Sequence, residues 1–236
     1  YKRQPQKRHV SRYSSTATRL SQRLLGSLAV EHRFDVEQWD IGNAFLNGFS
    51  FKVMREMCGH FGIAVPDVER QVFITVPGNV WYHLHEEGFH LDTPYRTGLY
   101  VLELLKAMYG LVDAPIIWSI ALRHFMVCDM HGKPSRYDDN FFYWPSTDDR
   151  GMQSLDAAIT IHVDDLVVSA PKQWLSRACS RFLPKFGKVK RQTLPFTSVG
   201  MEYSRLLGGG ILLAQVKYAE ALKPIPVKDG DAERCQ

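Results

Sequence analysis

The sequence predicts an α+β fold in which helices pack on one face of an antiparallel sheet. Two runs of β-branched residues flank the acidic pair Asp164-Asp165, which is typical of two strands joined by a tight turn. Another strand-like run leads to Asp40, so we expect a sheet of about four strands with this run beside the 159–169 hairpin. Apolar residues recur at helical spacing in three segments, of which the second and third are expected on the far face of the sheet: residues 16–31, 115–131 and 171–183.

The first half of the chain begins with a basic, polar stretch over residues 1–15, which is either a solvated end or an arm near phosphates. Asn47-Gly48 then marks a turn. The segment 83–96 is polar and rich in turn residues, so we expect a surface loop there. Hydrophobic patterning predicts the other elements of this half, which are strands over 33–39, 72–76 and 100–104 and a short helix near 51–61.

In the second half, Pro115 suits the first turn of a helix that Asp113 caps and Gly132 ends. Pro184 and Gly187 are expected to close the helix that begins after Pro171. A run of three glycines then turns the chain between two of the later elements. The remaining assignments are strands over 140–144, 196–203 and 211–213, a helix over 215–222, and a loose polar tail from Val227.

Composition sets the outer limits of the function. The chain has 236 residues, of which 45% are hydrophobic, so it can bury a sizeable core in one or two domains. Its net charge of +4 is compatible with a polyanionic partner. The four cysteines show no C-x-x-C spacing, which favours neither a zinc site nor a disulfide framework and points to a reducing, intracellular setting. No apolar run reaches membrane-spanning length and the start is no signal peptide, so we expect a cytoplasmic or nuclear protein.

Carboxylates at the ends of predicted strands are the candidate chemistry. Asp40 ends one strand, and Asp164 and Asp165 lie between two others. Carboxylates that converge from strand ends can bind hard divalent cations, which prefer oxygen ligands. The alternative is a solvated turn in an ordinary antiparallel pair, because Asp tolerates the backbone angles of tight turns.

Four stretches of the chain form recognisable motifs, which are DIGNAFLNG at 40–48, LKAMYGLVDAP at 105–115 followed by Trp118, HVDDL at 162–166, and GGGILLAQVKY at 208–218. These stretches resemble motifs of the reverse transcriptases of copia-type LTR retrotransposons. The similarity runs from about residue 12 to residue 222, and the motifs occur in the family's order.

The resemblance implies a polymerase palm with partial fingers and the start of a thumb. Residues 1–31 would be the basic arm and helix of the partial fingers, 32–190 the palm, and 191–236 the connection to the thumb with a loose tail. The implied function is template-directed DNA synthesis by two-metal nucleotidyl transfer, with two Mg²⁺ ions for which Mn²⁺ can substitute. The implied partners are an RNA or DNA template with its primer, deoxynucleoside triphosphates, and the RNase H and integrase segments of a polyprotein, in the cytoplasm, a virus-like particle or the nucleus.

By the same resemblance, Asp40, Asp164 and Asp165 would be the catalytic carboxylates. Asp40 and Asp164 would be the main metal ligands, Asp165 would assist near the primer end, and the backbone carbonyl of Ile41 would complete the shell. His162 stands where the family has a tyrosine that supports the primer end. Three clustered carboxylates repel one another, and a bound cation relieves that repulsion.

The nucleotide pocket is expected to include Phe45, Gly110, Asp113, Arg19 and Arg23. Phe45 would be an aromatic gate against a ribose 2′-hydroxyl, or else an ordinary core aromatic. Gly110 would allow close approach of the nucleotide, or else form a plain turn. Arg19 and Arg23 lie one helical turn apart and could clamp phosphate oxygens, although most such pairs are solvated. Lys106, by contrast, would contact the template or be a solvated charge.

The chain departs from the family pattern at four positions. Val112-Asp113 replaces Lys-Gln, so an extra negative charge would face a triphosphate, and Ile116 replaces an arginine. His162 replaces the tyrosine, which is a milder change because histidine also stacks and forms hydrogen bonds. These substitutions keep one alternative open, a decayed, inactive element that at most binds nucleic acid. A further alternative is another metal-dependent phosphoryl-transfer enzyme on a palm-like fold, because fold alone does not fix function and the pattern of Asp40 with Asp164-Asp165 is compatible with it.

Overall fold

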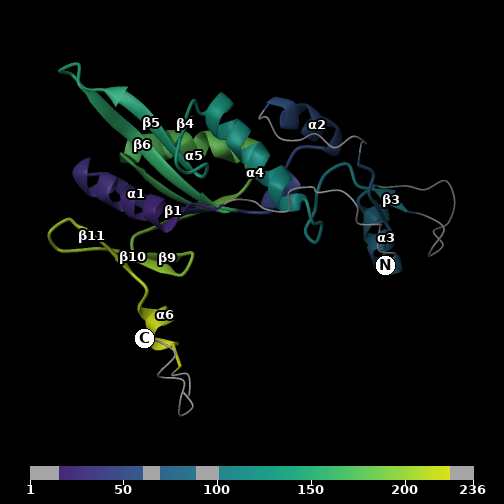
Figure 1. The fold of residues 1–236 in the computed structure, drawn as a ribbon. Coiled ribbons are helices and arrows are strands. Elements are labelled where there is room, and N and C mark those ends of the chain that lie inside the picture. Colours follow the sequence, from purple (N-terminus) through teal and green to yellow (C-terminus); the bar gives the residue numbers. More distant parts are fainter. Residues whose placement is uncertain (1–15, 61–69, 89–100, 224–236) are drawn as a thin grey trace, which may run out of the picture.

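A computed structural model describes residues 16–60, 70–88 and 101–223. The basic arm (1–15), the second half of the expected loop (89–96) and the tail from Val227 lie outside the described residues. The described chain mixes helices with antiparallel sheets, which confirms the α+β prediction (Figure 1). Within these residues, no helix combines the length and the apolar character needed to cross a membrane.

The main sheet has six antiparallel strands in the order β4-β5-β6-β7-β1-β8. The prediction of about four strands was too low because both edge strands lack a readable pattern. The edge strand β8 is polar and mostly exposed, so it shows no apolar alternation, and β4 has only two residues. The strands are β4 (Lys133–Pro134), β5 (Phe141–Thr147), β6 (Gln153–His162), β7 (Asp165–Ala170), β1 (Asp35–Ile41) and β8 (Val189–Thr193).

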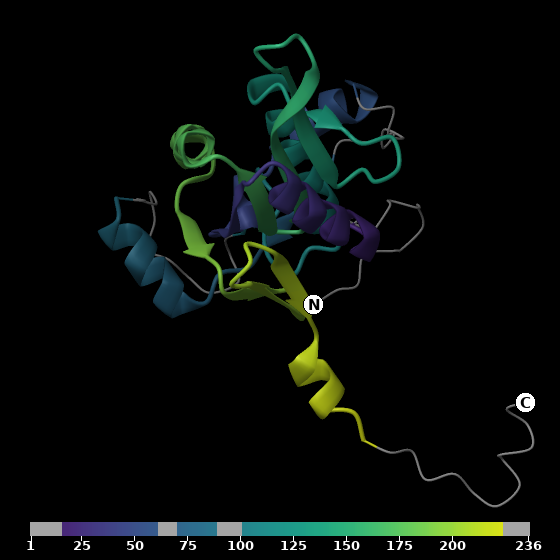
Figure 2. The same ribbon diagram turned by 90° about the vertical axis from the view of Figure 1, so that its left-hand side faces the viewer.

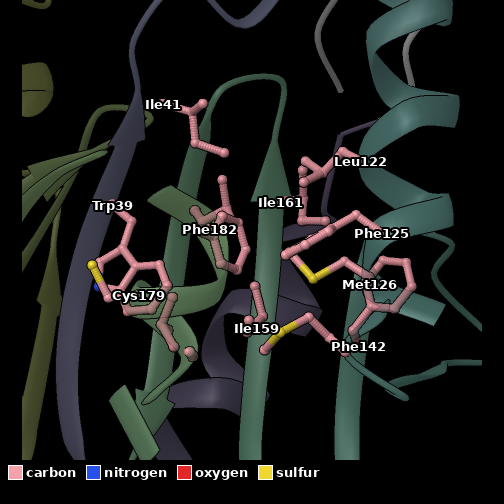
Figure 3. Close-up of a cluster of buried hydrophobic side chains, with 14 of the residues drawn as sticks. Trp39, Ile41, Leu122, Phe125, Met126, Phe142, Ile159, Ile161, Cys179 and Phe182 are labelled. Atoms are coloured by element: carbon pink, nitrogen blue, oxygen red, sulfur yellow. The ribbon is translucent and has the colours of Figure 1, made fainter. Parts of the chain in front are cut away.

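Two helices cover one face of this sheet, as expected. They are α4 (Ala114–His124), which continues as a π-helical turn η2 (Phe125–Asp129), and α5 (Lys172–Phe186). Alternate strand residues point toward them, because successive side chains in a strand face opposite sides. Figure 3 shows the resulting apolar core, in which side chains from the strands meet those of the helices, including Trp39, Ile41, Ile159, Ile161, Phe125, Met126 and Phe182.

The opposite face is partly covered as well. Helix α1 (Arg19–Glu31) and a three-stranded sheet pack against it around a second apolar cluster that contains Leu25 and Tyr203 (Figure 2). The expected strand over 196–203 is two strands, because Val199 and Gly200 adopt positive φ angles of 53° and 72° and reverse the chain. The small sheet consists of β9 (Phe196–Ser198), β10 (Met201–Arg205) and β11 (Ile211–Ala214).

A third group of elements follows Asp40 and leads to α4. It surrounds a small core that includes Phe51, Ala107 and Ile117. The expected surface loop over 83–96 is wrong at its start, because residues up to Glu86 belong to a helix whose Trp81 is buried. The elements are η1 (Ala44–Asn47), α2 (Phe51–His60), β2 (Phe73–Ile74), α3 (Gly78–Glu86) and β3 (Leu102–Glu103).

Some element ends differ from the predicted ones. Helix α5 continues past Pro184 to Phe186, whose ring is buried in the main core, and it ends at Gly187 as expected. Pro184 cannot donate to the carbonyl four residues earlier, so the last turn lacks this hydrogen bond although the helix continues through it. The last helix, α6, is shorter than expected and spans Val216–Glu220.

Candidate functional site

Four side chains form a row across the main sheet. Asp40 on β1 lies directly opposite Asp165 on β7, which confirms that the Asp40 strand lies beside the hairpin. Asp165 is in turn opposite His162 on β6, and Asp40 is opposite Lys190 on β8. Directly opposed residues of antiparallel strands point to the same face, with Cβ atoms about 4.5–5.5 Å apart. We call His162, Asp165, Asp40 and Lys190 the charged row.

The charged row lies on the face away from α4 and α5. Its neighbours along β1, Trp39 and Ile41, are buried in the core under those helices. Because strand side chains alternate, Asp40 between them points to the other face. The carboxylates therefore stand on a sheet whose opposite side is rigidly packed, which is a firm base for a site.

The turn between β6 and β7 is held in an unusual conformation. Val163 has a φ of 61°, which is unfavourable for a β-branched residue. Trp118 of α4 donates a hydrogen bond from Nε1 to the Val163 carbonyl at 2.7 Å, and its ring is fully buried. This bond fixes the peptide that precedes Asp164. Strained backbone held by surrounding packing is frequent at functional sites.

Asp164 is the second residue of this turn and lies next to the end of β1. The Ile41 N–H donates to the Asp164 carbonyl at 3.2 Å. The hairpin tip and the residue after Asp40 are thereby joined, so the three predicted catalytic carboxylates come from adjoining backbone. The Ile41 side chain is buried on the opposite face, and the role of its carbonyl as a metal ligand stays a prediction.

A single amide side chain fixes the turn that follows Asp40. Asn43 adopts a left-handed conformation with a φ of 54°. Asn47 Nδ2 lies within hydrogen-bonding distance of three carbonyl oxygens, those of Gly42 at 3.2 Å, Asn43 at 3.3 Å and Phe186 at 3.0 Å. The last contact ties the Asp40 turn to the end of α5.

The pKa of Asp165 depends on its burial and on the charges of its neighbours. Burial raises the pKa of Asp165 above its usual value, and a hydrogen bond from Gln38 Nε2 at 3.2 Å opposes that rise. The negative charges of Asp164 and Asp40 raise the pKa of Asp165 further, while His162 lowers it, and the net direction is upward. Such crowding favours a bound cation, which would stabilise all three ionised groups.

Among the described residues, no group of three or more His, Cys, Asp or Glu side chains is arranged to hold a metal ion. The donor set nevertheless fits Mg²⁺, because Asp40, Asp164 and Asp165 supply only oxygen ligands and crowd one another's charge. Mg²⁺ keeps several waters and needs only one or two carboxylates. Asp40 and Asp164 are the residues that could hold it, with Asp165 beside them.

The aromatic residue predicted as a sugar gate lies in η1, a few residues after Asp40. The Phe45 ring contacts the half-exposed Tyr109 ring at a centroid distance of 4.8 Å. Gly110 beside it has a φ of 93°, and a Cβ added there would meet no atom within 4 Å. Glycine is therefore favoured by backbone conformation and not by crowding within the described residues. Lys106 is exposed, and its backbone bridges to Ser50.

The extra negative charge expected from Asp113 is compensated. The Asp113 carboxylate is buried and pairs with Arg70, which also lies over the Phe51 ring. Burial raises the pKa of Asp113, and Arg70 partly offsets the rise. The carboxylate thus faces a guanidinium 43 positions upstream, and the place of Asp113 in the nucleotide pocket stays a prediction.

Arg19 and Arg23 are exposed on α1, which packs against the sheet face that bears the charged row. The start of α1 is fixed near the hairpin, since the Ala17 N–H donates to the Ile161 carbonyl at 2.9 Å. Ile161 immediately precedes His162. Arg19 is therefore the nearer of the two arginines along α1, and neither forms an ion pair with another described residue.

Neither a protein-family model nor a curated protein matches this chain. The geometry of the charged row and of its supports is thus the basis for any functional assignment.

Several supporting residues were not predicted. Gln38 could have been found, because it lies two positions before Asp40 and so shares its strand face. Lys190 could not, because its pairing with Asp40 depends on an edge strand without apolar alternation. Trp118 follows the motif at 105–115, but its hydrogen bond to the hairpin turn could not be predicted because it joins segments 45 positions apart.

The Asp165→Asn variant should melt at a higher temperature than the wild type at pH 7 without divalent cations. The pKa of Asp165 is raised in the folded protein, so the unfolded state loses this proton first as the pH rises. The wild type therefore loses stability between the usual carboxyl pKa and the raised one, and the penalty is complete at neutral pH. Asn removes it and can still accept the Gln38 hydrogen bond.

Melting curves in EDTA from pH 3 to pH 7 test this prediction. The difference between variant and wild type should shrink below the ordinary carboxyl pKa of 3.8. Asp149→Asn, at an exposed position between β5 and β6, is the matched control and should show no such pH-dependent gain. A variant less stable than the wild type at pH 7 contradicts the prediction.

Proposed function

We propose that this chain is the polymerase palm of a copia-type reverse transcriptase and catalyses template-directed DNA synthesis. One observation carries the proposal: Asp40 and Asp165, from the two acidic motifs, are direct cross-strand partners, and Asp164 is hydrogen-bonded to the residue after Asp40. Motif stretches that are far apart in the sequence thus meet at one place on the sheet. This is what a two-cation phosphoryl-transfer site requires.

The reaction joins a primer 3′-hydroxyl to the α-phosphate of a deoxynucleotide and releases pyrophosphate. Bound Mg²⁺ would supply positive charge to the phosphate oxygens and acidify the attacking hydroxyl. Asp40 and Asp164 would hold it. The protein's own task is to keep these carboxylates in place, and Trp118, Asn47 and the paired strands do so through bonds to the backbone on either side.

Positioning of the substrates falls to the residues around the carboxylates. Phe45, whose ring contacts that of Tyr109, would lie under the sugar of the incoming nucleotide and exclude a 2′-hydroxyl. His162 stands beside Asp165 in the charged row and would support the primer end. Lys190 would add positive charge next to Asp40, where phosphates approach. Gly110 and Arg19 complete the proposed nucleotide side.

Primer extension tests the proposal. On a poly(rA)/oligo(dT) template with Mg²⁺, the wild type should incorporate dTTP, and Asp164→Asn should incorporate none while it keeps the wild-type fold by circular dichroism. EDTA should stop the reaction and Mn²⁺ should restore it. The proposal is wrong if neither this chain nor a longer form that continues upstream of Tyr1 incorporates nucleotide.

A second candidate is an inactive palm that binds template and primer without turnover. The substitutions at Asp113, Ile116 and His162 within the family motifs favour it. It predicts salt-sensitive binding to template-primer and no incorporation under any metal. Any Asp164-dependent incorporation eliminates it.

A further inference from the structure

Two stretches of the chain contain basic residues and no acidic ones, residues 1–30 and residues 166–201. From Leu166 to Met201 there are seven basic residues and no Asp or Glu. Because the whole chain carries a net charge of +4, the rest of it must carry −3 (4 − 7 = −3). The second stretch, which forms α5, β8 and the turns that flank them, is thus more positive than the chain as a whole.

The structure places most of this charge on one surface. Arg177, Arg181 and Lys185 follow one another at intervals of four residues, so they lie along one side of α5. Lys172 is in the first turn of the helix and Lys188 follows its end. We call Lys172, Arg177, Arg181, Lys185 and Lys188 the α5 strip. All five side chains are exposed, and none forms an ion pair or hydrogen bond with another described side chain.

The start of the α5 strip has features that suit phosphate groups, and its end is joined to the candidate site. At its start, Lys172, Gln173, Ser176 and Arg177 line a shallow depression. The helix begins there after Pro171 with no side-chain cap and no acidic residue in its first turn, so its N–H groups point outward unopposed by negative charge. At the other end, the Lys188 carbonyl accepts a hydrogen bond from the Gly42 N–H at 3.0 Å.

The hydrogen bond between Gly42 and Lys188 connects the α5 strip to the candidate site. Gly42 follows Asp40 by two residues, and Lys190, two residues after Lys188, is the cross-strand partner of Asp40. A polyanion bound along α5 can therefore continue round the β8 edge of the sheet to the charged row. Figure 2 looks along α5, which lies at the outside of the molecule next to β8 and on the other side of the sheet from α1.

We propose that the α5 strip is a binding surface for the sugar-phosphate backbone of double-stranded nucleic acid, outside the catalytic face. The helix has 15 residues and is about 22 Å long, so a duplex laid along it presents about a dozen phosphate charges. The proposal extends the proposed function, because it gives the template-primer a second contact. It does not depend on catalysis.

Nucleic acid fits this surface better than a membrane does. A helix that binds a membrane surface inserts its apolar side chains into the lipid. In α5 those side chains are buried in the main core, and of its Leu and Phe residues only Leu183 is about half exposed. The outer surface thus offers charge and hydroxyl groups, which are the contacts that nucleic-acid backbones take.

Salt-dependent binding of a fluorescent RNA–DNA duplex of about 20 base pairs, followed by anisotropy, tests the proposal. In the triple variant Arg177→Gln, Arg181→Gln, Lys185→Gln, the slope of log K against log salt should become less steep by about 2–3. Affinity at low salt should fall about tenfold or more. The matched control neutralises three exposed basic residues elsewhere, Lys133, Arg136 and Arg150, and should change affinity by no more than about twofold.

Further arms separate the outcomes. Replacement of Arg177 and Arg181 by lysine should retain binding, because both positive charges are kept, and the circular dichroism of the triple variant should match that of the wild type. An unchanged slope in the triple variant, or strip-dependent binding of phosphatidylserine vesicles without binding of the duplex, overturns the proposal. Asp164→Asn should leave duplex binding intact. If the protein extends primers but the triple variant binds the duplex as well as the wild type does, only the proposed function is supported. If binding depends on the α5 strip but no primer is extended, only the role of the α5 strip is supported.

Discussion

Trp118→Ala should lower the free energy of unfolding by about 3–5 kcal/mol, the usual cost of deleting a fully buried aromatic side chain. Trp118 is completely buried between α4 and the main sheet, where its ring packs against Phe186 at a centroid distance of 5.2 Å. The variant also leaves the Val163 carbonyl without its donor. Urea denaturation of the wild type and the variant measures the difference.

Trp118→Phe separates the hydrogen bond from the packing. It keeps most of the buried area but loses Nε1, so its cost should be about 1–3 kcal/mol, that of an unsatisfied buried carbonyl. Because the bond holds the peptide before Asp164, incorporation should fall in this variant even at temperatures where it is fully folded. Tyr137→Ala, at a side chain that is 96% exposed, is the control and should change stability by less than about 0.5 kcal/mol. A Phe variant with wild-type stability and activity contradicts this account.

Asp40→Asn should reduce nucleotide incorporation by about a thousandfold, since loss of an ionised metal ligand removes several kcal/mol of transition-state stabilisation. The side chains have nearly the same shape, and Asp40 faces away from the core, so the fold should be retained. Rates of primer extension under saturating template and dTTP measure the effect.

The effect of Mg²⁺ on stability provides an independent test of Asp40→Asn. Added Mg²⁺ should raise the melting temperature of the wild type, because a ligand that binds only the folded state stabilises it. Asp40→Asn should lose this increase. Asp35→Asn, at the other end of β1, is the matched control and should keep both the increase and the activity. Wild-type incorporation by Asp40→Asn means that Asp40 is not a metal ligand.

Much of the fold is readable from local patterns. The runs of β-branched residues around Asp164 and the helical spacing in α1, α4 and α5 predict elements that the structure contains, because burial on one face imposes a period on the sequence. The pattern fails where burial is slight. Strand β8 is an exposed edge, and α3 buries little beyond Trp81, so both look like polar loops.

The candidate site is predictable only in part, and for a similar reason. That Asp40 and the acidic pair come together follows from their places at strand ends. Which residue faces which does not, because the register of strands so distant in sequence is set by packing across the whole sheet. The partner of Asp113 is likewise invisible, since Arg70 approaches it only through tertiary structure.

The α5 strip illustrates the opposite case, a feature that the sequence contains and that an overall average conceals. A net charge of +4 is unremarkable, yet it is the sum of a segment with no acidic residue and a remainder with an acidic excess. When the charge is counted segment by segment instead of over the whole chain, the basic segment can be distinguished from the acidic remainder.

The charged row spans four strands that meet in a single alignment. Sliding β1 by one position against β7 would turn Asp40 toward the core and Trp39 toward solvent, so no misaligned sheet can present the carboxylates together. Strand β1 pairs with β7, which lies more than a hundred residues downstream. The site can therefore assemble only late in folding, after β7 has been synthesised. Any cation-dependent signal from these carboxylates consequently also shows that the strands of the main sheet have paired in the correct register.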